Sequence, residues 1–589
     1  MCGDIHQFDR NGSIIREPRG SNRAFRCSLL QASNPMRPKR RYRETHGGKR
    51  QSLVQLQELV AAEAVHQPRE ILRIAREVQV PEATLRGVLS FYTDFQSKPG
   101  EVRVCQGTSC KLAGAAALAS GLRSRFQCRD VYCLGHCDRS PAVLSEQDNV
   151  FTGDQAWALG SGTSEVTPAQ EHRTSLRSLA PEPVVLRHVL KGNASDLQAG
   201  RAQGVYQSLA RALRRSPQEL LDTVERSELR GRGGAGFLTG AKWRSCAQAP
   251  GQPKYVVVNG DEGDPGSFID RVLMEDDPHS VLEGLILCAY AVGASQGIIF
   301  IRSEYPRAIA SMRQAIAAAY EQGILGASVL GSQFALEVSV CAGWGSYVCG
   351  EETAMLNAIE GWRGEVRTRP PYPAVEGLYG KPTVVNNVET LVCIPFLVER
   401  GAEVYAALGT ARSKGTKVFS LNHGFARPGL VEVEFGVTLL EVMAEAGEGA
   451  GGKRLEAVIL GGPMGSILLP HEWDVPVCYS RMAEKGIQLG HGGLVAIPKG
   501  TDFRALLEHW LEFMMDESCG KCVPCRLGSK RAWRLLLEQD GTTCQAHLGQ
   551  LFEVMEAASL CAFGQSMPRP MRKLMESFGD HIFKSGGRL

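Results

Sequence analysis

The stretch DESCGKCVPCRLGS, residues 516–529, constrains this chain more than any other. It places Cys519, Cys522 and Cys525 with two residues between neighbours, and Gly520 permits the tight turn that such a loop needs. Structural zinc usually takes two separated C-x2-C pairs, whereas a triple spacing with one remote cysteine is typical of an iron–sulfur cluster. The sequence therefore predicts a [4Fe–4S] cluster, with zinc as the alternative.

The fourth ligand has to come from elsewhere in the same helical region. Cys561, in ASLCAFGQ, follows a helical pattern and has a glycine nearby, where backbone can approach a cluster. Cys544, in GTTCQAH, is closer in sequence, and we expect it in a polar loop. Spacing favours Cys561 and leaves Cys544 open.

A second set of cysteines precedes these. Cys105 and Cys110 form a C-x4-C pair in CQGTSC, and Cys133 and Cys137 form a C-x3-C pair in CLGHC. Two loops that each donate two thiolates suit the two irons of a [2Fe–2S] cluster, with zinc again as the alternative. A Rieske centre needs two histidines, so we expect the single His136 to be exposed and not a ligand.

Length and composition set the broad class. The 589 residues predict three to five domains, and a net charge of +3 gives no signal for nucleic acid. Eighteen cysteines in a reducing compartment are expected to be metal ligands or small buried hydrophobes. Neither a signal peptide nor a clean apolar run of about 18 residues is seen, so we predict a cytoplasmic protein without membrane insertion.

The pattern of apolar residues divides the chain. Residues 35–43, PMRPKRRYR, predict a solvated basic tail, and helical periodicity follows over 52–94. Helices and strands alternate over 205–401, as in an α/β domain. Within it, the apolar run from Val281 is interrupted by polar residues and predicts a helix, a turn and a buried strand. Residues 416–495 predict a small mixed β domain, and the rest is helical.

A glycine-rich loop opens the α/β part. RGRGGAGFLTGAKW contains G-x-G-x-x-G at Gly231, Gly233 and Gly236, but ERSELR stands where the ordinary dinucleotide fold needs an apolar strand. The glycines can still expose backbone N–H groups to a phosphate or a flat ring. Phe237 offers a stacking face and Lys242 a cation. A purely structural loop is the alternative.

Polar side chains follow the strand KYVVVN. Asn259, Asp261, Glu262 and Asp264 lie just past its carboxyl end, where α/β proteins bind ligands. Such groups can hydrogen-bond the hydroxyls of a ribityl chain or a ribose. Solvated turn residues are the alternative.

Six motifs taken together resemble one family. GRGGAGF, NGDEGDPGSF, YVCGEETA, RPPYP, KPTVVNNVET and ESCGKCVPCRLG, in this order over residues 200–585, resemble the NADH-binding flavoprotein subunit of respiratory complex I. The diaphorase subunits of NAD-reducing hydrogenases and NAD-dependent formate dehydrogenases are relatives of that subunit. Residues 50–150 resemble the small thioredoxin-like [2Fe–2S] subunit of the same module, fused in front.

The resemblance implies a multidomain α/β architecture. Its expected parts are a basic irregular tail (1–50), a thioredoxin-like [2Fe–2S] domain (51–158), a linker (159–199), an FMN- and NAD-binding α/β domain that is not an ordinary Rossmann fold (200–412), a β-grasp domain (413–498) and a helical bundle with the [4Fe–4S] cluster (499–589).

The resemblance also implies the site residues. The FMN set is Gly231, Arg232, Gly233, Gly234, Lys242, Asn259, Asp261, Glu262, Tyr347, Gly350, Glu351, Val385, Asn386 and Asn387. The NAD(H) set is Phe237, Asp264, Glu352, Arg369 and Tyr372. Three of these differ from the commoner family residues: Asp264 replaces a Glu, Arg369 a Lys and Tyr372 a Phe. The match of SLCAFG to the family's fourth cluster ligand selects Cys561.

The function implied by the resemblance is that of an NAD(H)-reactive diaphorase subunit of a soluble multisubunit enzyme. Electrons would pass between NAD(H), FMN and the clusters, with no side chain needed as a catalyst. The expected partners are the catalytic subunit of a formate dehydrogenase or hydrogenase and further iron–sulfur subunits, with no nucleic acid. The alternatives are the NADH-binding subunit of membrane-associated complex I and an assembly module without flavin chemistry, which the intact motifs disfavour.

Overall fold

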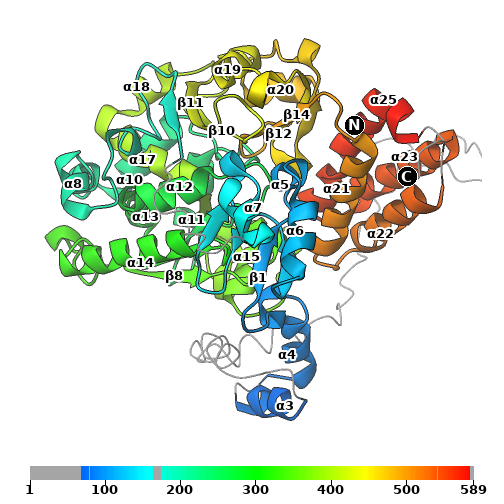
Figure 1. The fold of residues 1–589 in the computed structure, drawn as a ribbon. Coiled ribbons are helices and arrows are strands. Elements are labelled where there is room, and N and C mark those ends of the chain that lie inside the picture. Colours follow the sequence, from blue (N-terminus) through cyan, green and yellow to red (C-terminus); the bar gives the residue numbers. More distant parts are fainter. Residues whose placement is uncertain (1–67, 78–79, 163–173, 540, 584–589) are drawn as a thin grey trace, which may run out of the picture. The chain divides into compact units, whose positions relative to one another are not determined.

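The computed structural model describes residues 68–77, 80–162, 174–539 and 541–583 (Figure 1). The predicted basic tail and the first part of the predicted helical region, 52–67, lie outside these residues. No helix among the described residues is long and apolar enough to cross a membrane.

The first described region carries a four-stranded sheet of order β2-β1-β3-β4, in which β1 is parallel to β2 and antiparallel to β3. Its strands are β1 (Val102–Cys105), β2 (Cys128–Val131), β3 (Ala142–Leu144) and β4 (Val150–Thr152), and its helices are α3 (Pro68–Glu77), α4 (Glu82–Leu89), α5 (Thr108–Leu112), α6 (Ala115–Arg123) and α7 (Asp154–Ser161). This is the predicted thioredoxin-like region. The first pair of cysteines starts at the last residue of β1, and the second pair follows β2.

The α/β region is built on a parallel sheet of order β8-β7-β6-β9. Its strands are β6 (Tyr255–Gly260), β7 (Gln296–Ile301), β8 (Glu337–Ala342) and β9 (Thr383–Asn387). The main helices are α9 (Gln207–Ala212), α10 (Pro217–Arg226), α11 (Thr239–Gln248), α12 (Ile269–Asp276), α13 (Pro278–Val292), α14 (Pro306–Glu321), α15 (Glu352–Ile359) and α17 (Val388–Arg400).

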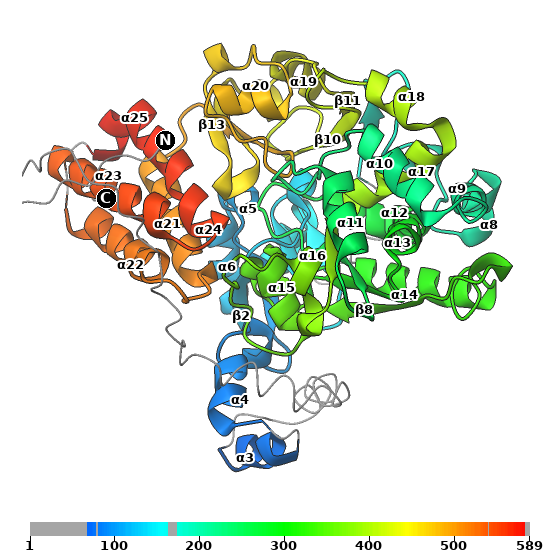
Figure 2. The same ribbon diagram turned by 180° about the vertical axis from the view of Figure 1, so that it is seen from behind.

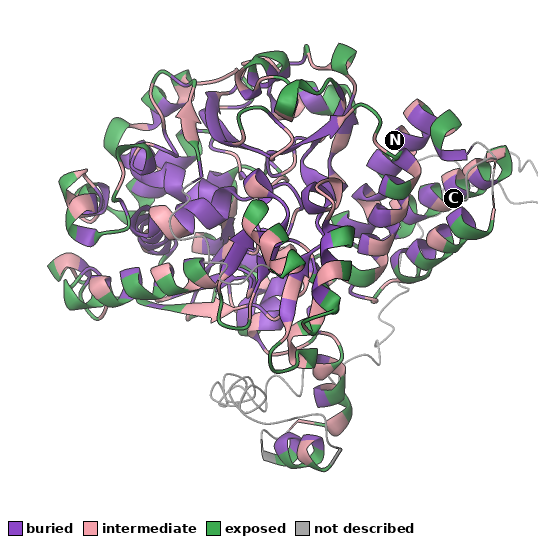
Figure 3. Cartoon of the chain, viewed as in Figure 1, coloured by how far each residue is buried: buried purple, intermediate pink, exposed green. Residues whose placement is uncertain are grey.

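Side chains alternate between the two faces of this sheet. Val256 and Val258 of β6 pack into the core that contains α13 and α17, whereas Tyr255 and Val257 pack with Met355 of α15 on the other side. The apolar run from residue 281 forms the buried helix α13 and the strand β7, as predicted. In Figure 3, α13 is buried and α14 presents an exposed face. Because β6 and β9 are parallel neighbours, their carboxyl ends bring Asp261 and Asn387 to one edge.

The region predicted as a β-grasp domain is a six-stranded sheet of order β13-β12-β14-β10-β11-β5. Its elements are β5 (Leu176–Ser178), β10 (Thr416–Leu421), β11 (Gly429–Glu434), β12 (Leu455–Leu460), β13 (Ser466–Leu468), β14 (Gly493–Pro498), α19 (Leu439–Ala446) and α20 (Tyr479–Glu484). Strand β5 corrects the predicted linker, since it pairs in parallel with β11 as part of the sheet. Its Ser- and Pro-rich surroundings concealed so short a strand.

Glu432 on β11 holds residues 184–186 of that predicted linker. Its buried carboxylate accepts hydrogen bonds from the backbone N–H groups of Val184, Val185 and Leu186 at 2.8, 2.9 and 2.8 Å. It also accepts one from Thr416 Oγ1 at 2.6 Å. One side chain therefore supplies the acceptors for three consecutive buried amides.

The C-terminal region is helical, as predicted. Its helices are α21 (Phe503–Glu517), α22 (Val523–Glu538), α23 (Gly541–Ala558), α24 (Ala562–Ser566) and α25 (Pro568–Phe583). Stacked rings of Phe503 and Phe578, with centroids 3.7 Å apart, join α21 to α25. Cys544 is buried within α23, so the expectation that it lies in a polar loop was wrong.

The thioredoxin-like region contacts both the helical region and the α/β region (Figures 1 and 2). Trp510 Nε1 on α21 donates to Thr108 Oγ1 at 3.3 Å, and the ring of Tyr132 packs edge-on against Phe513 at 5.1 Å. From the α/β side, Arg302 donates to the Tyr132 carbonyl at 2.7 Å. These contacts hold the loop around Cys133 from two directions.

Replacing Glu432 with Ala tests the anchoring of residues 184–186. Leaving three buried amides without acceptors should lower the local stability by roughly 3 kcal/mol, which is about 100-fold faster hydrogen–deuterium exchange at these amides. The control is Glu484→Ala, whose partners Arg412 and Arg481 are exposed, and which should leave the exchange of 184–186 unchanged. Equal exchange in both variants would contradict the anchoring role.

Candidate functional site

Four thiols gather in the thioredoxin-like region. Cys105, Cys110, Cys133 and Cys137 are each about 1% exposed. The Sγ atoms of Cys133 and Cys137 lie 3.4 Å apart, and the Cys105 thiol is within hydrogen-bonding reach of Cys110 and Cys133. Backbone N–H groups also face the sulfurs. The backbone nitrogen of Leu134 lies 3.5 Å from Cys105 Sγ. Two loops thus bring two thiols each to one buried point, as a [2Fe–2S] cluster requires.

The α/β region covers the loop that carries Cys133 and Cys137, so the expectation that His136 is exposed was wrong. His136 is 5% exposed, and burial lowers the pKa of its imidazole well below the ordinary value. The loop is covered because Arg271 Nε donates to the Gly135 carbonyl at 2.8 Å, and a Cβ at Gly135 would lie 2.5 Å from the Tyr305 ring. The sequence pattern carried no information about this docking.

A second group of thiols lies in the C-terminal region. Burial, together with the nearby thiols of Cys522, Cys561 and Cys519, raises the pKa of Cys525 to about 12. Cys522 and Cys561 are the N-cap residues of α22 and α24, so two helix starts face the same point. The structure thus brings together the four cysteines of the predicted [4Fe–4S] set.

Cys544 points elsewhere. Its thiol donates to the Leu535 carbonyl at 3.4 Å within the helical core. Close packing instead ties α24 to the cysteine loop, because a Cβ at Gly564 would lie 3.1 Å from the Cβ of Cys525. The geometry therefore favours Cys561 over Cys544 as the fourth thiol.

The glycine loop lies between the end of β9 and α20. It is closed by a hydrogen bond from the Gly231 N–H to the Phe237 carbonyl at 2.8 Å. A Cβ at Gly233 would lie 3.1 Å from the Cβ of Asn387, and a Cβ at Gly236 would lie 3.0 Å from the Tyr479 ring. Only glycine lets the loop pack this closely. Phe237 is 58% exposed.

Arg232, a member of the predicted FMN set, directs its side chain into the protein. It is completely buried, and its guanidinium donates to the carbonyls of Thr416 and Lys414 and to the Tyr405 hydroxyl at 3.0, 2.8 and 2.8 Å. It also lies 4.8 Å above the Phe435 ring. These contacts commit the guanidinium to the protein interior, so Arg232 anchors the loop to the six-stranded sheet.

The end of β6 presents the acidic groups that were predicted. Asn259 Nδ2 donates to the Gly350 carbonyl at 2.8 Å, and its Oδ1 accepts from the Asp261 N–H at 3.1 Å. Asp261 Oδ2 is buried without a hydrogen-bond partner among the described residues, and burial raises the pKa of this carboxyl well above its ordinary value. Asp264 accepts from the Tyr347 hydroxyl. An unpaired buried oxygen is suited to a ligand hydroxyl.

The start of α15 brings charged groups to the same place. Glu351 caps the helix by accepting from the backbone N–H groups of residues 353 and 354, both at 2.9 Å. Glu352 pairs with Arg369 at 3.0 Å and with Lys242 at 3.5 Å. Lys242 also donates to the Val385 carbonyl at 3.0 Å. Tyr372, at 59% exposure, lies in the segment that follows Arg369.

Two asparagines end β9 and are held from opposite sides. Asn386 Oδ1 accepts from Trp243 Nε1 at 2.8 Å. Asn387 Nδ2 donates to Asp270 Oδ2 at 2.6 Å and lies 3.2 Å from His491 Nε2. The side chains of both asparagines are therefore fixed by neighbours within the chain.

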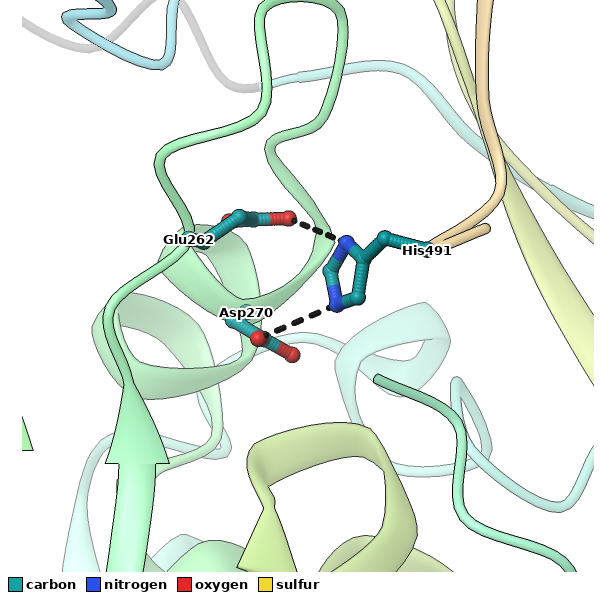
Figure 4. A group of neighbouring side chains, drawn as sticks. All are labelled: Glu262, Asp270 and His491. Carbon is teal, nitrogen blue, oxygen red and sulfur yellow. Dashed lines mark ion pairs between the residues drawn. The ribbon is translucent and has the colours of Figure 1, made fainter. Parts of the chain in front are cut away.

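Sequence reasoning missed Asp270 and His491. His491 lies between the carboxylates of Glu262 and Asp270, as Figure 4 shows. The available signal was the run GHGG at 490–493, a histidine between glycines just before the apolar run LVAI. Its partners are more than 200 residues away in the chain, so only the fold reveals them.

These groups fit the cofactors that the sequence predicts. The close-packed glycine loop, the paired Lys242 and the unpaired Asp261 oxygen suit a phosphorylated polyhydroxyl ligand such as FMN. Eight thiols in two sets of four suit two iron–sulfur clusters.

Three protein families match separate parts of the chain. Residues 224–396 match the Nuo51 FMN-binding domain, and residues 505–584 match the NADH-ubiquinone oxidoreductase-F iron–sulfur binding region. Residues 39–156 match the thioredoxin-like [2Fe–2S] ferredoxin family. The matches confirm the predicted FMN, [4Fe–4S] and [2Fe–2S] cofactors.

Individual relatives agree with these matches. NADP-reducing hydrogenase subunit HndC of Solidesulfovibrio fructosivorans is 44% identical over 64% of this chain and 77% of that protein. An NADH-quinone oxidoreductase subunit of Rhizobium meliloti is 42% identical over 67% of this chain and 96% of that protein. Among solved structures, an NAD+-reducing [NiFe]-hydrogenase in the H2-reduced state has a TM-score of 0.77 at 27% identity, covering 91% of this chain and 93% of that chain.

The positions of Cys561 and Cys544 give a paired test of the second thiol group. Cys561→Ser should lower the iron content from about six to about two atoms per chain, because a [4Fe–4S] cluster loses one of four ligands. Cys544→Ser should keep all the iron. Iron and acid-labile sulfide analysis of anaerobically purified protein measures both. Iron loss in Cys544→Ser, with retention in Cys561→Ser, would reverse the assignment.

Proposed function

The chain belongs to the family of FMN- and iron–sulfur-containing NADH dehydrogenase subunits that includes the NADH-quinone oxidoreductase relatives, and we propose how its residues divide the work of an NAD(H)-reactive diaphorase. FMN, when bound, supplies hydride exchange with NAD(H) and single-electron transfer to the clusters. The chain itself binds, orients and shields these groups.

The flavin is proposed to bind between the glycine loop and the ends of β6 and β9. Backbone N–H groups of the loop and the ammonium of Lys242 are suited to a phosphate. The unpaired oxygen of Asp261 is suited to a ribityl hydroxyl. Asn386 and Asn387, whose side chains are held in place by Trp243 and Asp270, present fixed amides to the ring. Arg232 contributes through the loop that it anchors.

The nicotinamide nucleotide is proposed to bind at the exposed aromatic groups of the same edge. Phe237 and Tyr372 are the exposed rings, and Glu352 and Arg369 are the charged groups between them in the chain. Arg369 pairs with Glu352 at 3.0 Å, so the 2′-phosphate of NADP(H) would have to compete with that carboxylate for its guanidinium. We therefore favour NAD(H) over NADP(H), with the ratio of kcat/KM for the two nucleotides as the direct measure.

Tyr347 supports the [4Fe–4S] cluster as the first electron acceptor. Its hydroxyl donates to Asp264 at the flavin edge, while its backbone N–H donates to Glu517 at 2.8 Å. Its ring lies 5.6 Å from that of Phe563, which is two residues from Cys561. One residue thus bridges the proposed flavin edge and the [4Fe–4S] loop. The [2Fe–2S] cluster then serves as a second relay or a side branch.

The partner is proposed to be a catalytic subunit that oxidises hydrogen or formate, together with further iron–sulfur subunits. The observation that carries this proposal is the structural match to an NAD+-reducing [NiFe]-hydrogenase chain, which covers 91% of this chain and 93% of that chain. A match of this extent is too long to leave out the [2Fe–2S] region, so it supports a hydrogenase-type partner. A complex I role is the second candidate, since the NADH-quinone oxidoreductase relatives share the flavin and [4Fe–4S] parts.

Anaerobic purification of the tagged chain from its native cell, with mass spectrometry of bound subunits, tests the partner. A hydrogenase subunit or a molybdenum-containing subunit would support the proposal and choose between hydrogen and formate. Membrane subunits would overturn it in favour of complex I. NADH oxidation with an artificial acceptor is expected of the purified complex in each case.

Replacing Phe237 with Ala tests the nucleotide site. Loss of a stacking face worth roughly 1.5 kcal/mol should raise the KM for NADH about tenfold and leave FMN content unchanged. Val554→Ala removes an apolar side chain of similar exposure, 55%, on α23 of the C-terminal region and should leave KM unchanged. An unchanged KM in Phe237→Ala would exclude Phe237 from the nucleotide site.

A further inference from the structure

His491 forms a buried ionic bridge between the six-stranded sheet and the α/β region (Figure 4). It precedes β14, whereas Glu262 follows β6 and Asp270 lies on α12. Its Nδ1 is 3.2 Å from Glu262 Oε1, and its Nε2 is 3.1 Å from Asp270 Oδ2. Burial disfavours charge on the imidazole, but pairing with Asp270 and Glu262 outweighs it and holds the pKa of His491 well above its ordinary value.

The two carboxylates are held in place independently of the histidine. Glu262 accepts from the backbone N–H groups of Ile269 at 2.6 Å and Arg271 at 3.0 Å, one on each oxygen. Asp270 accepts from the backbone N–H of Glu389 at 3.3 Å. His491 therefore lies between two carboxylates that backbone hydrogen bonds hold in place, and each would lose an ion pair without it.

The cluster is an ion-pair bridge and not a metal site. Its potential ligand atoms lie within 4.8 Å of one another. The two ring nitrogens of His491, however, point in different directions, each toward its own carboxylate at 3.1–3.2 Å. A single ion cannot be ligated by both nitrogens of one imidazole ring. Both Glu262 oxygens are also already used by backbone N–H groups.

The bridge directly supports groups of the proposed flavin site. Asn387 Nδ2 lies 2.6 Å from Asp270 Oδ2 and 3.2 Å from His491 Nε2. A Cβ at Gly233 would lie only 3.1 Å from the Cβ of the same Asn387. A Cβ at Gly234 would lie 3.7 Å from the backbone nitrogen of His491. The glycine loop and the amide of Asn387 thus pack against the bridge.

We propose that His491 is a positioning residue of the flavin site, which orients Asn387 through Asp270 and balances two buried carboxylates beside the glycine loop. The inference rests on the proposed flavin site. Without the imidazole cation, the carboxylates of Glu262 and Asp270 make the site more negative. Reduction adds negative charge to a bound flavin, so the midpoint potential of FMN should fall together with its affinity.

The test uses the full chain carrying His491→Gln, which keeps a hydrogen-bond donor but removes the charge. FMN affinity is measured by fluorescence and its midpoint potential by spectroelectrochemical titration. We expect FMN to bind roughly tenfold more weakly or worse, with a lowered potential. The matched control is His471→Gln, an exposed histidine of the same region, which should change neither quantity. Unchanged affinity and potential in His491→Gln would overturn the inference.

A double variant separates charge balance from folding. Asp270→Asn added to His491→Gln removes one carboxylate together with the cation, so the potential should return toward that of the wild type. If His491→Gln fails to fold, the double variant alone tests the inference. Bound FMN with a nearly normal potential supports the inference, and lost FMN or a lowered potential overturns it. Failure of the wild-type chain to bind FMN would instead refute the proposed flavin site.

Discussion

Buried charge pairs hold the six-stranded sheet against the α/β region, and the proposed flavin site lies where they meet. Lys417 on β10 and Glu389 on α17 are both fully buried and form one pair. The backbone N–H of Glu389 donates to Asp270, which in turn pairs with His491. Each buried charge is costly without its partner, so the two regions can satisfy these groups in only one relative position. That constraint also fixes the positions of the glycine loop, Asn387 and the acidic end of β6.

The thioredoxin-like region depends on similar contacts with its neighbours. Its cysteine loops are covered from the six-stranded sheet, where His423 donates its backbone N–H to the Cys137 carbonyl at 2.8 Å. Trp510 of the helical region and Arg302 of the α/β region cover the other sides. The four thiols are thereby withdrawn from solvent, so the proposed [2Fe–2S] cluster is placed to exchange electrons within the chain. The [4Fe–4S] thiols are less enclosed, because Cys522 is only partly buried.

The sequence was informative where chemistry depends on local spacing. The two cysteine sets, the glycine loop and the polar ends of β6 and β9 were predicted because each motif is a short segment whose parts fold together. It failed where the outcome depends on distant partners. His136 was expected in solvent but is covered, and no pattern indicated that the guanidinium of Arg232 bonds to the Thr416 carbonyl. The role of His491 depends on carboxylates that no periodicity could place beside it, and β5 is a strand only because β11 lies next to it.

The central claim is that one chain carries electrons from a nicotinamide nucleotide through FMN to an iron–sulfur cluster. Anaerobic titration of the purified chain with NADH, followed by flavin absorbance and by electron paramagnetic resonance, tests it most directly. NADH should bleach the flavin absorbance, and the resonance signal of a reduced [4Fe–4S] cluster should rise with it. Flavin bleaching without any cluster signal, or no bleaching in a chain that contains FMN, would contradict it.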